Sequence, residues 1–167
     1  MTEVLTQQQA ESESPGLALD RAHPSKPMIT AAQIARRVRR LGRQVSDVYA
    51  DIDTPLVMVV ILKGATVFAA DLLRSLSIPA ELEFVRASSY GSGTSSSGKV
   101  KFAHMVDGPL TGRHLLLVED IVDSGRTIYT ILKRFRRMKP ASLCVAALLD
   151  RPARREIDVP IDFVSTF

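Results

Sequence analysis

The sequence predicts an α/β domain with a largely parallel sheet and helices on both faces. Continuous apolar, β-branched runs at residues 56–62, 114–118 and 142–149 are typical of strands buried on both sides. Segments with helical periodicity precede and separate these runs. Because parallel strands need crossover connections, strands that alternate with helices favour this architecture over an all-β or all-α one.

The N-terminal part divides into an extension and the first helix. Residues 1–25 are rich in Gln, Glu, Ser and Pro without periodicity, which predicts a disordered or loosely ordered extension before a domain at 26–167. Thr30 and Gln33 have the spacing of a capping box, so a helix should begin there and run to about Tyr49. Its apolar stripe comprises Ile34, Val38, Leu41, Val45 and Val48.

The middle of the chain predicts a strand, a helix and a hairpin. The 56–62 strand ends at Lys63-Gly64, and a helix at 66–76 follows, with Val67, Ala70, Leu73 and Leu76 expected to point inward. A strand is expected at 81–87. Residues 88–98 contain six Ser and three Gly, which predicts a mobile loop, closed by a short strand at 99–105.

The remaining elements repeat the strand–helix pattern. The 114–118 strand leads directly into Glu119 and Asp120, and a helix is expected at 125–138. Strands at 142–149 and 161–164 complete the sheet. The inward positions of the helix are Ile128, Ile131, Leu132 and Phe135.

The bulk properties indicate one globular domain. The chain has 167 residues, 46% hydrophobic and 24% charged, and no apolar run approaches the ~18 residues that span a bilayer. A single cysteine, Cys144, excludes an internal disulfide, which favours the reducing cytoplasm. The net charge of +4 fits an anionic ligand, but also a merely basic surface.

The segment at 115–127 has the chemistry of a sugar-phosphate clamp. Glu119 and Asp120 lie at a strand tip, where open parallel sheets bind ligands, and adjacent carboxylates suit a ribose diol or a metal bound to it. The next helix start offers free N–H groups to a phosphate. The phosphate-facing residues are Asp123, Ser124, Gly125, Arg126 and Thr127.

This strand–turn–helix segment closely resembles the 5-phosphoribosyl-1-pyrophosphate (PRPP) motif of type I phosphoribosyltransferases, hypoxanthine-guanine branch. Lys63-Gly64 resembles the pyrophosphate loop of that family, and Ser89-Tyr90 resembles its flexible flap. The resemblance covers about residues 28–164 and implies a Rossmann-like fold. It implies purine salvage: transfer of the phosphoribosyl group from PRPP to N9 of hypoxanthine or guanine, with release of pyrophosphate.

The resemblance also implies a role for each residue. Glu119 and Asp120 hold the ribose and Mg²⁺, Asp123 is the general base, and Lys63 and Gly64 meet the pyrophosphate. The 5′-phosphate is held by Ser124, Gly125, Arg126 and Thr127, with Asp123 beside them. Family members form homo-oligomers, dimers or tetramers.

Two features depart from the family pattern. Arg151 stands where the purine-specific branch has a lysine that contacts the 6-oxo group, so it is the expected purine-binding residue. The chain also stops at Phe167, short of the base-binding hood of related enzymes. A second reading is therefore a PRPP-binding regulator with weak or no catalysis, and a third is a phosphoribosyltransferase for another base. Arginine-rich runs in two helices could contact RNA, but solvated helix faces explain them better.

Overall fold

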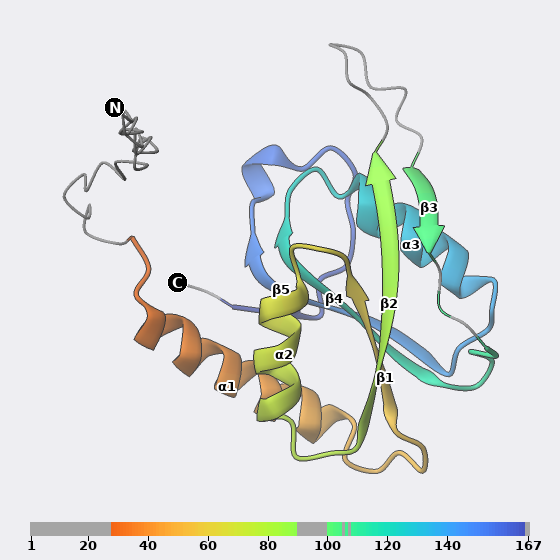
Figure 1. Cartoon of the computed structure of the whole chain (residues 1–167), viewed down its shortest axis with the longest axis horizontal. Helices are drawn as coiled ribbons and strands as arrows, with labels where there is room; N and C mark the ends of the chain where they lie inside the picture. Colours follow the sequence, from red (N-terminus) through yellow and green to blue (C-terminus); the bar gives the residue numbers. More distant parts are fainter. Residues whose placement is uncertain (1–27, 90–99, 105, 107, 166–167) are drawn as a thin grey trace, which may run out of the picture.

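The computed structural model describes residues 28–89, 100–104, 106 and 108–165 (Figure 1). The predicted extension at 1–25 and most of the Ser/Gly-rich segment, Tyr90 included, lie outside the described residues. The helices are α1 (Ala31–Val48), α2 (Thr66–Ser75) and α3 (Arg126–Arg136), with a short 3₁₀ helix η1 (Pro152–Arg154). The strands are β1 (Leu56–Ile61), β2 (Ala80–Ser89), β3 (Val100–His104), β4 (His114–Val122), β5 (Ser142–Asp150) and β6 (Phe163–Val164).

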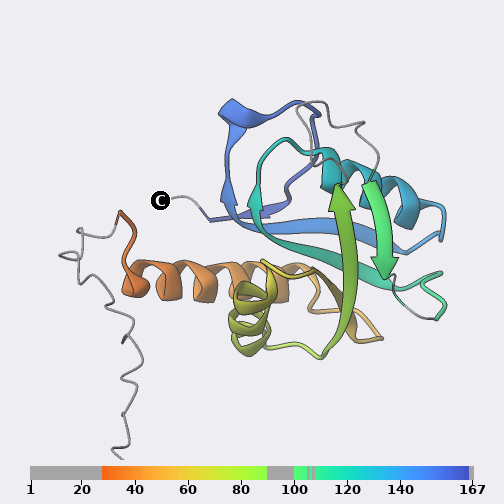
Figure 2. The same cartoon turned by 45° about the horizontal axis from the view of Figure 1, so that its top comes forward.

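All six strands form one sheet in the order β3-β2-β1-β4-β5-β6. Every neighbouring pair is parallel except β2 and β3, which form an antiparallel hairpin. Helices α1 and α2 cover one face, and α3 covers the other (Figure 2). The predicted α/β fold with helices on both faces is confirmed.

The core consists of two layers, one on each face of the sheet. Alternate strand residues serve the two layers: Met58 and Leu116 pack towards α1 and α2, while Val59 and Leu117 pack towards α3. Burial on both faces explains why these strands read as unbroken apolar runs.

Helix α1 begins with the predicted capping box. Gln33 N donates to Thr30 Oγ1 at 3.2 Å, and Thr30 N donates to Gln33 Oε1 at 2.7 Å. Val38, Leu41 and Val45 of the predicted stripe are buried and Ile34 is half-buried, but Val48 at its end is 62% exposed. Tyr49, which caps the helix, is buried instead, because the chain turns there and its larger ring occupies the core.

The face predicted for α2 was partly wrong: Leu73 and Leu76 are half-buried and pack against the core, but the centre of the buried face lies elsewhere. Val67 is 74% exposed, whereas Phe68, Ala69 and Leu72 are buried. Together with buried Ala65 they form an i, i+3, i+4, i+7 stripe that competes with the predicted one, and it contains the larger side chain, Phe68. The inward residues predicted for α3 are all buried.

Strand β4 is longer than predicted and this places the acidic pair within it. Pairing with β1 ends at Val60↔Val118, but pairing with β5 continues to Val122↔Asp150. The last residues of β4 therefore project beyond the end of β1. The chain leaves β1 towards β2 on one side and returns to β4 on the other, and open α/β sheets bind ligands at such a switch point.

Candidate functional site

A recess of about 320 Å³, including its part open to solvent, lies at the junction of β4 and α3. It collects most of the segment that the sequence singled out. Its lining residues are Glu119, Ile121, Val122, Asp123, Ser124, Gly125, Thr127 and Ile128. Asp120 and Arg126 are not among the described residues that line it.

The floor of the recess is the start of α3. Gly125 precedes the helix with φ +82°, a left-handed conformation, and has no side chain to cap it. A Cβ at position 125 would also collide with the Ile157 carbonyl oxygen, so both conformation and space require glycine. Arg126 N donates to Ser124 Oγ at 3.4 Å, a long hydrogen bond, and the helix has no other side-chain cap, so its first turn can offer N–H groups to a ligand beside the hydroxyls of Ser124 and Thr127.

Glu119 is held in an environment that disfavours its charge. Burial raises its pKa to about 9, and the hydrogen bond and negative charge of Asp120 add to this effect. Glu119 Oε2 is buried and has no hydrogen-bond partner among the described residues. A buried carboxylate oxygen without a partner is costly, so a cation or a hydroxyl group would satisfy it.

Asp120 connects β4 with the loop after β1. Its Oδ1 accepts from Ile121 N at 2.8 Å, while its Oδ2 lies 2.5 Å from where a Cβ on Gly64 would stand. The structure thus brings the predicted Lys63-Gly64 loop against the acidic pair. The peptide bond between Leu62 and Lys63 is cis, and Lys63 O accepts from Thr66 Oγ1 at 2.8 Å.

Arg126 points elsewhere than the sequence suggested. Its Nε donates to Oε2 of Glu156, a residue in the loop after β5, at 2.6 Å. The Arg126 side chain therefore joins the start of α3 to the loop after β5 and does not line the recess. Ser89 is the last residue of β2, paired with Val100, and Tyr90 lies outside the described residues.

The loop after β5 contributes a cluster of arginines that the sequence reading mostly missed. Arg151 Nη1 and Arg154 Nε each lie 3.7 Å from Asp123 Oδ1. Arg155 is an ion-pair partner of Asp150, and its Nε donates to the Asp123 backbone oxygen at 3.1 Å. Of these arginines, the sequence predicts a binding role only for Arg151. The available signal was the density of charge at residues 150–156 directly after a buried strand.

The same loop is fastened to the recess through its backbone. Glu156 N and Ile157 N both donate to Ser124 O at 3.0 Å, and Arg151 N donates to Val122 O at 3.0 Å. The loop after β5 and the turn before α3 are therefore held together by backbone hydrogen bonds. Such an arrangement can hold a base on one side and a sugar phosphate on the other.

The fit to a divalent cation rests on two carboxylates. The described residues contain no group of three or more His, Cys, Asp or Glu side chains placed to hold a metal. A Mg²⁺ ion, however, is commonly held by one or two carboxylates plus substrate oxygens and water. Glu119, with its unpaired Oε2, and Asp120 match that donor set.

Within the described residues no helix could cross a bilayer.

Comparisons with known proteins agree with this geometry. A model of the phosphoribosyl transferase domain matches residues 28–166. The chain is 42% identical over 142 residues to a hypoxanthine phosphoribosyltransferase of Salmonella typhimurium, covering 85% of this chain and 80% of that protein. It is 41% identical over 141 residues to a hypoxanthine-guanine phosphoribosyltransferase of Mycobacterium avium, covering 82% and 70%.

A solved structure gives the same answer for the fold. A hypoxanthine-guanine phosphoribosyltransferase from Bacillus anthracis superposes with a TM-score of 0.76 and 34% identity, covering 84% of this chain and 80% of that one. The family model, which matches residues 28–166, extends from α1 to the end of the sheet and includes the residues of the recess between β4 and α3. The chain therefore belongs to the phosphoribosyl transferase domain family.

Proposed function

We propose that this chain transfers the 5-phosphoribosyl group of PRPP to N9 of hypoxanthine or guanine and releases pyrophosphate. The observation that carries the proposal is the recess in which Glu119, Asp123 and the start of α3 face one space. The names of the relatives, which are hypoxanthine and hypoxanthine-guanine phosphoribosyltransferases, supply the substrate class.

The residues divide the substrate between them. Ser124, Gly125, Thr127 and the first N–H groups of α3 bind the 5′-phosphate, with Arg126 keeping the adjacent loop in place. Glu119 and Asp120 bind the ribose hydroxyls. Lys63 and the Gly64 backbone approach the pyrophosphate, where the close contact between Gly64 and Asp120 sets their position.

Glu119 and Asp120 would also hold Mg²⁺, which neutralises charge on the departing pyrophosphate when bound. In the reaction a bond forms between N9 and C1 of the ribose while the bond from C1 to the pyrophosphate oxygen breaks. Asp123 accepts the proton that the purine imidazole edge gives up, and Arg151 donates to the 6-oxo group. Arg151 and Arg154 lie near the Asp123 carboxylate, each at 3.7 Å from its Oδ1.

A lid over the recess is the role proposed for Ser89 and Tyr90. Excluding water would protect the electron-poor ribose carbon from hydrolysis.

We also propose one domain at 26–167 with an extension at 1–25, a cytoplasmic location and a homo-oligomer. The family match at 28–166 supports the domain limits.

A turnover assay tests the proposal. The 167-residue chain is supplied with Mg²⁺, PRPP and, separately, hypoxanthine, guanine or xanthine, and nucleotide and pyrophosphate are measured together. Equal amounts of both products from hypoxanthine or guanine are expected. Binding of PRPP without nucleotide formation, together with salt-sensitive RNA binding, would instead identify a PRPP-binding regulator.

A further inference from the structure

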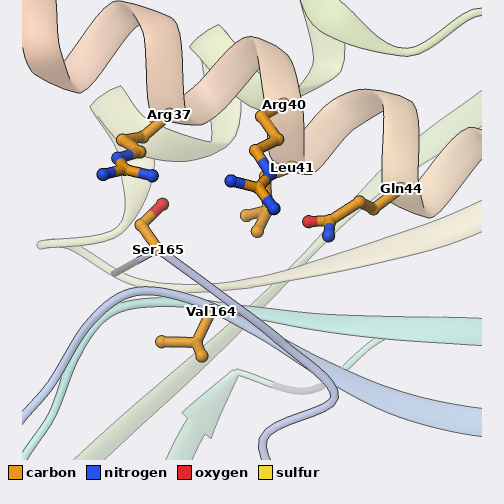
Figure 3. A pocket seen from close by; sticks show the side chains of 6 residues that line it. All are labelled: Arg37, Arg40, Leu41, Gln44, Val164 and Ser165. Carbon is orange, nitrogen blue, oxygen red and sulfur yellow. The ribbon is translucent and has the colours of Figure 1, made fainter. Parts of the chain in front are cut away.

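A second recess lies away from the candidate active site, between α1 and the end of β6 (Figure 3). It measures about 290 Å³ including its solvent-open part. None of its lining residues also lines the recess at the junction of β4 and α3, which we call the PRPP recess. They are Arg37, Arg40, Leu41, Gln44, Val164 and Ser165.

Ser165 is the first indication that this recess is built for a ligand. The residue is only 7% exposed, and its Oγ has no hydrogen-bond partner among the described residues. Its backbone is fixed, because Ser165 N donates to Ala147 O at 3.3 Å. Figure 3 shows the hydroxyl oxygen directed towards α1, into the space below the arginines. A buried hydroxyl without a partner is unfavourable unless a ligand supplies one.

The charge of the lining identifies the class of ligand. The guanidinium groups of Arg37 and Arg40 extend from α1 into the same space, and the Gln44 side chain approaches it from the next turn (Figure 3). Among the described lining residues none carries a carboxylate. Leu41 and Val164 form the apolar part of the wall, which reduces the competition of water for an anion.

We propose that this recess binds a phosphate group. The Arg40 guanidinium can bind phosphate oxygens through paired N–H donors, and the Ser165 hydroxyl and the Gln44 amide can add further donors. The recess is small, so it would enclose the phosphoryl group alone, and the rest of a phosphorylated metabolite would project into solvent. The α1 and β6 segments would then be joined by one anion.

Nuclear magnetic resonance of the full chain separates this site from the PRPP recess. Inorganic phosphate is titrated into ¹⁵N-labelled protein at constant ionic strength, so that screening does not change. Saturable shifts are expected at the amides of Val164 and Ser165, with an affinity distinct from that at Gly125 and Thr127. A linear, non-saturating response at Val164 and Ser165 would overturn the proposal.

Matched variants show whether the lining residues of the second recess bind the phosphate. Arg40→Gln and Ser165→Ala are each expected to weaken phosphate binding at Ser165 by roughly tenfold, the effect of one charge-assisted or buried hydrogen bond. Arg36→Gln removes the same charge from the same helix outside the lining and should leave the affinity unchanged. An equal loss in Arg36→Gln would show general charge attraction and overturn the site.

Acetate provides the comparison with another anion. A carboxylate has one negative charge and two oxygens, so it should bind at Ser165 more weakly than phosphate. Binding of acetate as tightly as phosphate would overturn the assignment to phosphate. Weaker acetate binding with the variant pattern above would support it.

Discussion

Gly64 and Asp120 lie so close that a methyl group on residue 64 would stand 2.5 Å from Asp120 Oδ2. The two residues come from the loop after β1 and from the projecting end of β4. The contact couples the proposed pyrophosphate loop to the proposed ribose-binding pair. Any residue larger than glycine at position 64 must therefore displace the Asp120 carboxylate.

Gly64→Ala is expected to lower kcat/KM for PRPP by about 10-fold to 100-fold, the effect of a misplacement near one ångström. Stability should change little, because the displaced group is the end of a half-exposed side chain. Steady-state nucleotide formation and urea unfolding measure the two effects. Val67→Ala, at an exposed position of α2, is the control. Full activity in Gly64→Ala would remove this contact from the mechanism.

Asp123→Asn tests the proposed general base. The side chain lies in the recess near Arg151 and Arg154, so the amide should fit without moving the loop. Loss of proton acceptance is expected to lower kcat by about 10²-fold or more, with a much smaller change in KM for PRPP. Asp158→Asn, an exposed position in the same region, is the control. An unchanged kcat in Asp123→Asn would exclude the role.

The parts of the fold that depend on local pattern were predictable from the sequence. The capping box of α1, the buried strand β1 and the inward face of α3 follow from spacing and composition alone. The turn at residues 123–127 was also recognisable, because one carboxylate, two hydroxyls and a glycine lie within five consecutive residues. The structure places four of those five residues in one recess.

The parts that depend on distant contacts were not predictable. The burial of Phe68 instead of Val67 is decided by the sheet beneath α2, and the length of β4 is decided by its pairing with β5. The direction of Arg126 depends on Glu156, thirty residues away. Each of these follows from tertiary packing, which overrides local preference.

Glu119→Gln should change how stability depends on pH in the metal-free protein. Burial raises the pKa of Glu119 to about 9 in the folded chain, against about 4.5 ordinarily. The folded chain therefore keeps a proton that the unfolded chain releases, so the contribution of Glu119 to stability is full below pH 4.5 and is lost as the pH rises towards 9.

Urea unfolding with chelator at several pH values between those limits measures this effect. Glu119→Gln should exceed the parent in stability by about 1–3 kcal/mol near the upper limit and show a smaller advantage near the lower one. Glu83→Gln, on β2, controls for removal of a carboxylate. A difference independent of pH would contradict the raised pKa.

Arg155 is expected to matter more for stability than its neighbour Arg154. The Arg155 side chain is 15% exposed and pairs with Asp150, whereas the Arg154 side chain is 62% exposed. Arg155→Leu leaves the Asp150 carboxylate without its partner and should cost about 3 kcal/mol in unfolding free energy. Arg154→Gln should cost less than about 0.5 kcal/mol, as expected for a surface charge.

The double variant Arg155→Leu with Asp150→Leu separates stability from positioning. It should recover most of the stability, because no unpaired charge remains buried. Activity should stay low, because Arg155 Nε also donates to the Asp123 backbone oxygen and that bond is not restored. Urea unfolding and the KM for hypoxanthine are measured on the same preparations. Recovery of both stability and KM would show that Arg155 supports only the ion pair and does not position Asp123.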